Sequence, residues 1–147
     1  MFDGASANQI GGIGVHLLIT QDHYFCFKLG FGLSTNTRFE LLALWTLLYC
    51  DKSMVLPTLH IHGDYIAIIN WLNRRSSLTL LALDGWCQCI HDMEPCFIQL
   101  KAVHIFREHN TKADSLSKEA LTLASGLLQY IEFIDGECTD QGTFQLL

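Results

Sequence analysis

The sequence predicts an α/β domain, in which helices flank a mixed five-stranded sheet with three antiparallel strands first and parallel strands after them. Two observations favour this fold class. The chain opens with three strand-like segments, and helical and strand-like segments then alternate up to about residue 130. The composition agrees, because 147 residues suit one domain, and 50% hydrophobic against 16% charged residues suffices for one packed core.

The three opening strands are expected to be antiparallel. The first surrounds Asp3, the second covers residues 11–20, and the third, residues 23–31, is its hairpin partner across a polar Gln21-Asp22 turn. The residues Ser34-Thr35-Asn36-Thr37 are typical of a helix N-terminus and precede an apolar run, so we expect a helix over about residues 38–52.

Alternating elements follow. Pro57 marks the break before a strand over residues 58–63, and apolar residues at helical spacing predict a helix over residues 64–73. A strand is expected over residues 96–106, and a last helix from Asn110 to about Tyr130. We therefore assign residues 1–131 to the domain and leave residues 132–147 as a C-terminal tail of unknown role. A further helical stretch before residue 96 places four residues on one face: Leu83, Trp86, Cys87 and Ile90.

Charge and apolar runs limit the function classes. A net charge of −6 argues against tight nonspecific binding to nucleic acid, since phosphate binding usually depends on lysine and arginine. This charge does not exclude a nucleic-acid site whose carboxylates are neutralised by divalent ions. No targeting segment is visible, and the longest apolar stretch, residues 41–50, is too short to span a bilayer. We expect an intracellular monomer, in the nucleus or the cytoplasm, with no membrane partner.

The cysteines show no C-x-x-C pair and no zinc-ligand spacing. Most sit inside apolar runs, where a free thiol behaves as a small hydrophobe, so reduced core cysteines are favoured over a disulfide framework. They are Cys26, Cys50, Cys87, Cys89, Cys96 and Cys138.

Four carboxylates sit where the expected elements meet. Asp3 lies in the first strand, Glu40 in the first turn of the first helix, Asp64 at the end of the fourth strand, and Asp114 in the first turn of the last helix. Four ionised carboxylates share a site only when cations neutralise them, and oxygen ligands favour magnesium or manganese. Such a site would suit phosphodiester hydrolysis with two metal ions. For each residue taken singly the alternative is stronger: Glu40 and Asp114 could simply complement a helix dipole, and Asp3 could be a turn residue before Gly4.

The segments around these carboxylates resemble a known family. Phe2-Asp3-Gly4-Ala5-Ser6, Thr35-Asn36-Thr37-Arg38-Phe39-Glu40-Leu41, Gly63-Asp64 and Asn110-Thr111-Lys112-Ala113-Asp114 occur in that order. Together they are similar to the type 1 ribonuclease H family, most closely its plant retrotransposon branch, over roughly residues 1–130.

The resemblance implies a ribonuclease H-like sheet and an endonuclease that cuts the RNA strand of RNA–DNA hybrids, leaving 5′-phosphate and 3′-hydroxyl ends. It implies two Mg²⁺ ions, with Mn²⁺ as a substitute, held by Asp3, Glu40, Asp64 and Asp114. Arg107 is expected to have an auxiliary role near the leaving phosphate, for which a bidentate guanidinium is suited. The resemblance also places the chain within a larger retroelement polyprotein.

Short residues beside the carboxylates are candidates for substrate binding. Gly4-Ala5-Ser6 offers close backbone approach and a hydroxyl to a sugar-phosphate chain. Thr35, Asn36 and Thr37 present polar groups at a helix N-terminus; the resemblance implies contacts across the minor groove of the hybrid, where 2′-hydroxyls are exposed. The alternative is that Thr35 and Asn36 only cap the helix.

Other residues leave alternatives open. His60, His62 and Asp64 alternate along one strand and could form a metal site by themselves. Tyr65 after Asp64 and Phe39 before Glu40 are expected to crowd the site, and a first strand that is short for the family is expected to hold Asp3 loosely and impair activity. The rival interpretations are a retroelement-derived nucleic-acid-binding remnant with little catalysis, and an interaction module unrelated to nucleic acid.

Overall fold

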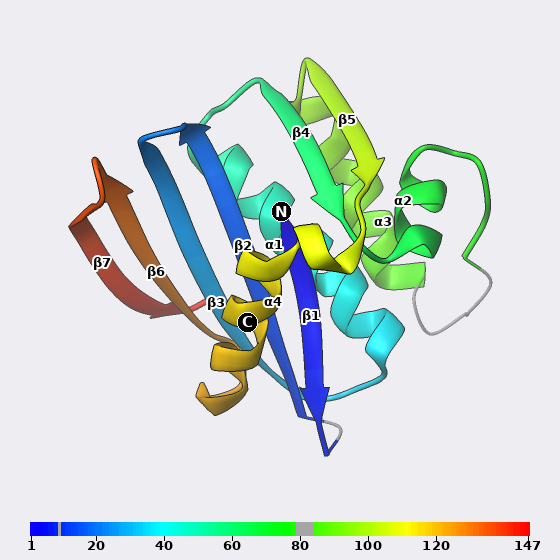
Figure 1. The fold of residues 1–147 in the computed structure, drawn as a ribbon. Coiled ribbons are helices and arrows are strands. Elements are labelled where there is room, and N and C mark those ends of the chain that lie inside the picture. Colours follow the sequence, from blue (N-terminus) through cyan, green and yellow to red (C-terminus); the bar gives the residue numbers. More distant parts are fainter. Residues whose placement is uncertain (9, 79–83) are drawn as a thin grey trace.

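The computed structural model describes residues 1–8, 10–78 and 84–147 (Figure 1). Within these ranges the strands form a five-stranded antiparallel sheet in the order β1-β2-β3-β6-β7 and a separate parallel pair, β4-β5, with four α-helices around them. The elements in chain order are β1 (Phe2–Ala7), β2 (Ile10–Thr20), β3 (His23–Leu33), α1 (Asn36–Ser53), β4 (Thr58–Gly63), α2 (Ile66–Leu72), α3 (Asp84–Met93), η2 (Glu94–Cys96), β5 (Gln99–His104), η3 (Arg107–His109), α4 (Thr111–Glu119), η4 (Ala120–Thr122), β6 (Leu127–Ile134) and β7 (Glu137–Gln145).

Helices α1 and α4 cover opposite faces of the large sheet (Figure 1). Helix α1 is buried along most of its length, because it lies between β1 and β2 on one side and α3 on the other. On the opposite face, Gly12 and Gly14 of β2 let the backbone of α4 approach closely: a Cβ on Gly14 would lie 2.3 Å from the carbonyl oxygen of Ala113. This packing brings the N-terminal part of α4 beside β1.

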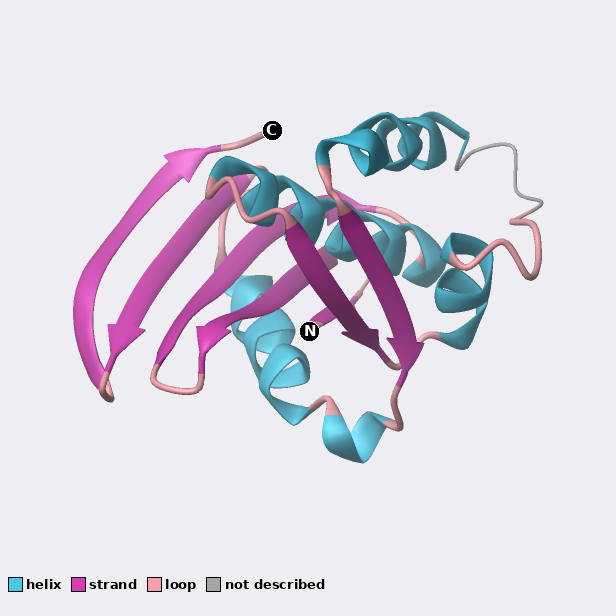
Figure 2. Ribbon diagram, turned by 90° about the horizontal axis from the view of Figure 1, so that it is seen from above, coloured by secondary structure: helices cyan, strands magenta, loops and turns pink. Residues whose placement is uncertain are grey.

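The elements expected over the first 110 residues are confirmed, but the sheet differs from the expectation. Strands β4 and β5 are parallel as expected, yet they form a ladder of their own instead of continuing the large sheet (Figure 2). The fourth and fifth strands of the large sheet are β6 and β7, and all its pairings are antiparallel. Of the helix-face residues before residue 96, Ile90 is buried, and Leu83 lies outside the described residues.

The expected last helix to Tyr130 is wrong. Helix α4 ends at Glu119, and Gly126, at φ +80°, starts a strand instead. Half of the residues that follow are aromatic or β-branched, and the segment pairs with β3, where Phe133 stacks on Tyr24 with ring centroids 5.1 Å apart. The boundary expected between residues 131 and 132 falls inside β6.

The cysteine expectation is correct for two residues. Cys26 and Cys50 are free thiols in the core, whereas Cys89, Cys96 and Cys138 are exposed. The expectation of core positions is wrong for these three: Cys96 belongs to η2, which has no buried residue, and Cys138 belongs to β7, which is almost wholly exposed. Among the described residues, no helix has both the length and the apolar character needed to cross a membrane.

Candidate active site

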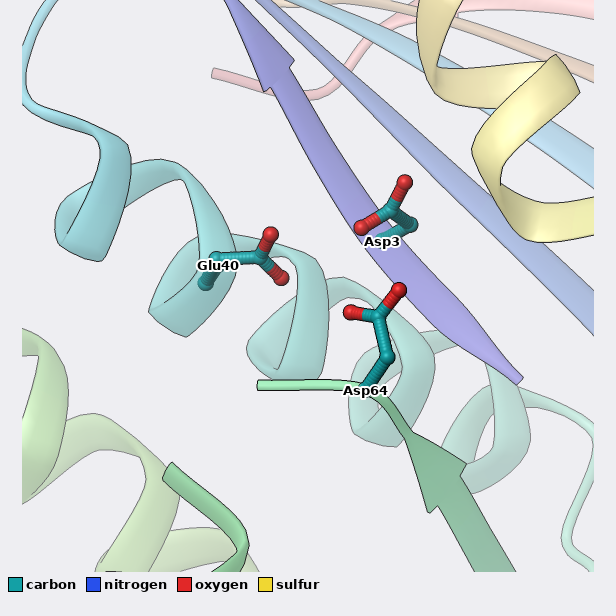
Figure 3. A group of neighbouring side chains, drawn as sticks. All are labelled: Asp3, Glu40 and Asp64. Atoms are coloured by element: carbon teal, nitrogen blue, oxygen red, sulfur yellow. The ribbon is translucent and has the colours of Figure 1, made fainter. Parts of the chain in front are cut away.

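Three carboxylates converge between β1, α1 and β4 (Figure 3). Asp3 lies on β1 and is 4% exposed, Glu40 lies on α1 and is 7% exposed, and Asp64 directly follows β4. One carboxylate oxygen from each lies within 4.8 Å of the others. Glu40 belongs to the second turn of α1 and not to the first as expected, because the helix already begins at Asn36.

A backbone contact sets the positions of Asp3 and Glu40. A Cβ on Gly4 would lie 2.7 Å from the carbonyl carbon of Phe39, so β1 can approach α1 this closely only with glycine at this position. The residue before Gly4 and the residue after Phe39 therefore present their carboxylates to the same space.

Asp64 is brought to the same place by β4. A Cβ on Gly63 would lie 2.7 Å from the ring of Phe2, so the end of β4 packs directly on the start of β1. The carbonyl oxygen of Asp64 lies 3.2 Å from His104 Nε2, and Ile105 N–H donates to the Gly63 carbonyl at 3.0 Å. These contacts hold the residue between β4 and the end of β5.

The electrostatics of this group favour a cation. Burial, followed by the charge of Asp3, raises the pKa of Glu40 to about 9, and burial, followed by the charge of Asp64, raises the pKa of Asp3 to about 6. Glu40 Oε2 is buried without a hydrogen-bond partner. A divalent ion would satisfy this oxygen and neutralise the mutual repulsion, and an oxygen-only donor set fits magnesium or manganese. The residues thus fit the metal that the sequence implied.

Asp114 lies at the edge of the same cavity but is held differently. Lys118 Nζ donates to its Oδ2 at 2.8 Å, and Arg107 Nη2 lies 3.7 Å from its Oδ1. The hydrogen bond from Lys118 lowers the pKa of Asp114. Ser117 links the Asp3 carboxylate to the backbone of α4, since its hydroxyl lies 3.2 Å from Asp3 Oδ2 and 2.7 Å from the Asp114 carbonyl oxygen. Asp114 therefore faces the site as part of an ion-paired cluster.

The carboxylates line a cavity of about 560 Å³ that also contains several of the expected substrate-binding residues. Ser6 donates its hydroxyl to Asn36 Oδ1 at 2.6 Å. Thr35 and Thr37 do not line the cavity. Thr35 caps α1 by accepting from Arg38 N–H at 3.3 Å, and Thr37 Oγ1 lies 2.9 Å from the hydroxyl of Tyr65. The lining residues are Asp3, Gly4, Ala5, Ser6, Asn36, Glu40, Asp64, Tyr65, Arg107, Asp114, Lys118 and Leu121.

The expectations about crowding of the site and about a histidine metal site have different outcomes. Tyr65 does line the cavity, but Phe39 is fully buried and its ring packs on Phe31, away from the carboxylates, so it does not crowd them. The described residues contain one group at metal-ligand spacing, and it does not include His60 or His62. A separate histidine metal site is thus not supported.

Two contacts of this cluster were not predicted from the sequence: the ion pair of Lys118 with Asp114 and the contact of Ser117 with Asp3. The signal for Lys118 was present, because it follows Asp114 by four residues on a helix. For Ser117 no sequence signal marked the contact with Asp3, since it depends on how α4 lies across the sheet.

Comparison with known proteins agrees with this geometry. A family described as reverse transcriptase-like matches residues 1–120. The chain belongs to the reverse transcriptase-like family. No curated protein sequence matches it significantly. The matched region contains all four carboxylates, and the resemblance to type 1 ribonuclease H domains is confirmed by this family together with the structural neighbours.

Solved ribonuclease H1 structures share the fold of this reverse transcriptase-like chain. LC11-RNase H1, in complex with an RNA/DNA hybrid, has a TM-score of 0.75 at 23% identity, over 82% of this chain and 93% of its own. RNase H1 from the archaeon Halobacterium salinarum NRC-1 has a TM-score of 0.67 at 20% identity over the same shares. The N-terminal RNase H domain of rv2228c from Mycobacterium tuberculosis has a TM-score of 0.67 at 17% identity, over 82% of this chain and 95% of its own.

Proposed function

We propose that the protein hydrolyses the RNA strand of RNA–DNA hybrids internally, leaving 5′-phosphate and 3′-hydroxyl ends. The observation that carries this proposal is the convergence of Asp3, Glu40 and Asp64 in a polar cavity of a reverse transcriptase-like chain. The fold likeness to LC11-RNase H1, whose structure contains an RNA/DNA hybrid, supports the choice of substrate.

In this proposal Asp3, Glu40, Asp64 and Asp114 hold two divalent ions, magnesium or manganese. Bound ions would supply the positive charge that activates the attacking water and stabilises the leaving oxygen. Glu40, with its pKa raised to about 9, gives up a proton when a cation occupies the site. The close contact of β1 with α1 keeps Asp3 and Glu40 at fixed separation.

The cavity also offers groups for the substrate. Ser6 and Asn36 present a hydroxyl and an amide beside the carboxylates, and both could bond to the 2′-hydroxyl that distinguishes RNA from DNA. Gly4 and Ala5 line the cavity without adding a bulky side chain to its wall. Arg107, whose side chain is 77% exposed, is placed to contact a phosphate. The N-terminus of α1, with Thr35 and Thr37, would lie along the strand of the hybrid whose 2′-hydroxyl Ser6 and Asn36 contact.

The test is cleavage of a hybrid with a label on each strand, in magnesium and then in manganese. We expect cleavage of the RNA strand alone, abolished by Asp64→Asn and retained by Asp92→Asn, an exposed aspartate on α3. Duplex DNA of the same sequence should remain intact. End analysis of the product reports the 5′-phosphate.

A second function is favoured by one feature of the site. Asp114 is ion-paired with Lys118, which reduces the negative charge available to a metal ion and so suits a nucleic-acid-binding remnant without strong catalysis. Hybrid binding by the folded protein without cleavage, at any divalent ion concentration tested, would support this remnant. Absence of both activities would favour an interaction module. Either role is compatible with a place in a larger retroelement polyprotein.

A further inference from the structure

The side chains of Asp3 and Glu40 start from opposite sides of β1. Gly4 faces α1, since a Cβ on it would meet the backbone of Phe39, and side chains alternate along a strand, so Asp3 faces α4. Glu40 belongs to α1 (Figure 3). The Asp3 carboxylate therefore has to turn around the edge of β1, the outer strand of the large sheet, to join the other two carboxylates.

A hydroxyl on α4 contacts the carboxylate that makes this turn. Ser117 Oγ lies 3.2 Å from Asp3 Oδ2, and Ser117 is fully buried. Ser117 is not among the residues that line the carboxylate cavity, so it has no direct access to a substrate there. Any effect of Ser117 on the chemistry therefore passes through Asp3.

The backbone of Ser117 is fixed against the sheet. A Cβ on Gly14 would lie 2.4 Å from Ser117 N, and a Cβ on Gly12 would lie 2.2 Å from Ser117 O. Gly14 is also the residue of β2 that pairs with Asp3. The hydroxyl and the carboxylate are thus held by two backbones that both contact Gly14, which leaves little freedom in their separation.

A second side chain of α4 holds β1 at the residue before Asp3. Asn110 Nδ2 donates to the carbonyl oxygen of Phe2 at 3.0 Å, and Asn110 is fully buried. Although Asn110 is the N-cap residue of α4, its side chain makes no capping hydrogen bond. Helix α4 thus contacts the backbone on one side of Asp3 through Asn110 and the carboxylate itself through Ser117.

The Ser117 hydroxyl has one proton and two acceptors within reach. The closer acceptor is the Asp114 carbonyl oxygen at 2.7 Å, three residues earlier on the same helix, and such local bonds are common for serine. Asp3 Oδ2 is farther away but belongs to a carboxylate, and an ionised acceptor makes the stronger hydrogen bond. An experiment has to separate the bond to Asp3 from the bond within the helix.

We propose that Ser117 is a positioning residue for metal binding. Its hydroxyl donates to Asp3 Oδ2 and holds this carboxylate in one rotamer, turned toward Glu40, before an ion arrives. Without this bond the ion would have to fix the rotamer itself, and loss of a hydrogen bond that orients a metal ligand weakens affinity by about 10- to 100-fold. The inference rests on the metal-dependent nuclease proposed above.

The first measurement is the χ1 angle of Asp3 in the metal-free protein, from the NMR couplings between its Hα and Hβ protons. We expect the couplings of a single staggered rotamer in wild type and averaged couplings in Ser117→Ala. Alanine keeps the Cβ of serine and is a better helix former, so this variant should fold. The matched control is Ser115→Ala, which removes the same hydroxyl from the exposed side of α4 and should leave Asp3 in one rotamer.

The second measurement is the dissociation constant for magnesium, by titration calorimetry. We expect it to rise about tenfold in Ser117→Ala and to stay unchanged in Ser115→Ala. In hybrid cleavage, kcat of Ser117→Ala should fall at limiting magnesium and recover at saturating magnesium. KM for the hybrid should not change, because Ser117 does not line the cavity.

A single Asp3 rotamer in Ser117→Ala, or averaged couplings already in wild type, would overturn the proposal. Equal or tighter magnesium binding by Ser117→Ala would also overturn it, and tighter binding would mean that the hydroxyl only competes with the ion for Asp3. Wild-type protein that binds magnesium with Asp3 in one rotamer, loses both properties in Ser117→Ala, yet cuts no hybrid would support the role of Ser117 and overturn the nuclease instead.

Discussion

Lys118 Nζ lies 2.8 Å from Asp114 Oδ2, one helical turn away on α4. With Arg107 near the other oxygen, the carboxylate that completes the set of four is already neutralised by cationic side chains. Within the described part of the chain the remaining three carboxylates have no such partners, and the pKa values of Asp3 and Glu40 are raised. The site thus contains three carboxylates that no described cationic side chain neutralises, and a fourth, Asp114, that is ion-paired.

Removing this cation should strengthen metal binding. In Lys118→Met the pKa of Asp114 rises toward its ordinary value, but its charge at neutral pH becomes available to a metal ion. We expect the dissociation constant for magnesium to fall by about threefold, because an exposed ion pair is worth about 0.2–1 kcal/mol. Titration calorimetry measures this, with Lys112→Met, an exposed lysine on the same helix, as control. Equal or weaker magnesium binding in Lys118→Met would show that Lys118 does not compete.

The raised pKa of Glu40 predicts a pH dependence of stability. Between its ordinary pKa of 4.5 and about 9 the folded protein holds a proton that the unfolded chain has lost, so the free energy of unfolding should decrease as pH rises through this range. Met1 and His16, whose pKa values are lowered by burial, give the opposite slope in part of the range. Urea unfolding from pH 6 to 9 should therefore compare wild type with Glu40→Gln, in which the decrease due to Glu40 is absent; below about pH 6 the raised pKa values of Asp3 and Asp51 add a decrease of their own. Identical slopes would contradict the assignment.

The contact between β1 and α1 can be tested at Gly4. The added Cβ in Gly4→Ala meets the Phe39 backbone at 2.7 Å and must push the strand from the helix. We expect a loss of about 1–3 kcal/mol in stability, typical of overpacking, together with loss of hybrid cleavage. In the control Gly32→Ala the Cβ has only the Ser125 hydroxyl within reach, at 3.4 Å, and stability should change by less than about 0.5 kcal/mol. A stable Gly4→Ala protein with full cleavage would show that this spacing is not required.

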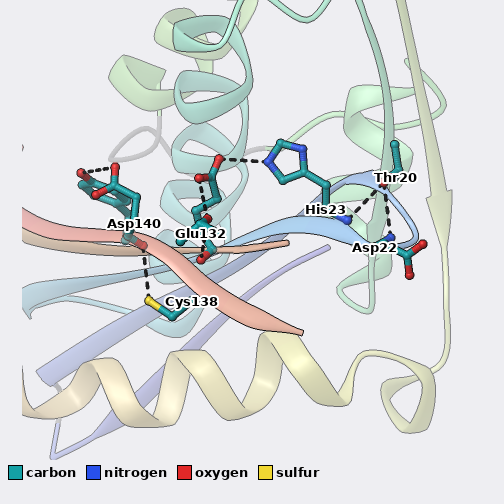
Figure 4. A network of polar contacts seen from close by, with 8 residues as sticks. Thr20, Asp22, His23, Glu132, Cys138 and Asp140 are labelled. Atoms are coloured by element: carbon teal, nitrogen blue, oxygen red, sulfur yellow. Dashed lines mark hydrogen bonds and ion pairs between the residues drawn. The ribbon is translucent and has the colours of Figure 1, made fainter. Parts of the chain in front are cut away.

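A chain that ends at Ile131 tests the role of the C-terminal hairpin. It lacks β7 and the last three residues of β6, and so loses the Tyr24–Phe133 stack and the contact of His23 Nε2 with Glu132 Oε2 at 2.9 Å (Figure 4). Cross-strand pairs contribute roughly 0.2–1 kcal/mol each, so we expect a loss of about 2 kcal/mol or more. Thermal unfolding measures it. An unchanged melting temperature would mean that residues 132–147 are a dispensable tail.

Local signals in the sequence were sufficient for much of the fold. Capping by Thr35 and the apolar run behind it predicted α1, and Pro57 with the alternation after it predicted β4 to its exact bounds. The four carboxylates could be selected because each lies in a short segment of recognisable composition. Convergence of Asp3, Glu40 and Asp64 followed from where strands end and helices begin in an α/β domain.

The features that were predicted wrongly or missed depend on tertiary pairing. Apolar residues after Leu127 are compatible with either a helix or a strand, and pairing with β3 decides for a strand. The separation of β4 and β5 from the large sheet depends on which backbone edges meet, which local sequence does not specify. The ion pairs of Asp114 depend on Arg107 as well as on the helix spacing.

The hairpin of β6 and β7 also affects how the protein behaves in concentrated solution. Without it the sheet would end at β3, whose aromatic Phe25 and Phe27 would invite association between copies. The outermost strand is instead β7, which is almost wholly exposed, mostly polar, and carries Glu137 and Asp140. Two such acidic strands repel each other on approach. Resistance to aggregation should therefore be greatest at low ionic strength and should decline as salt screens this repulsion.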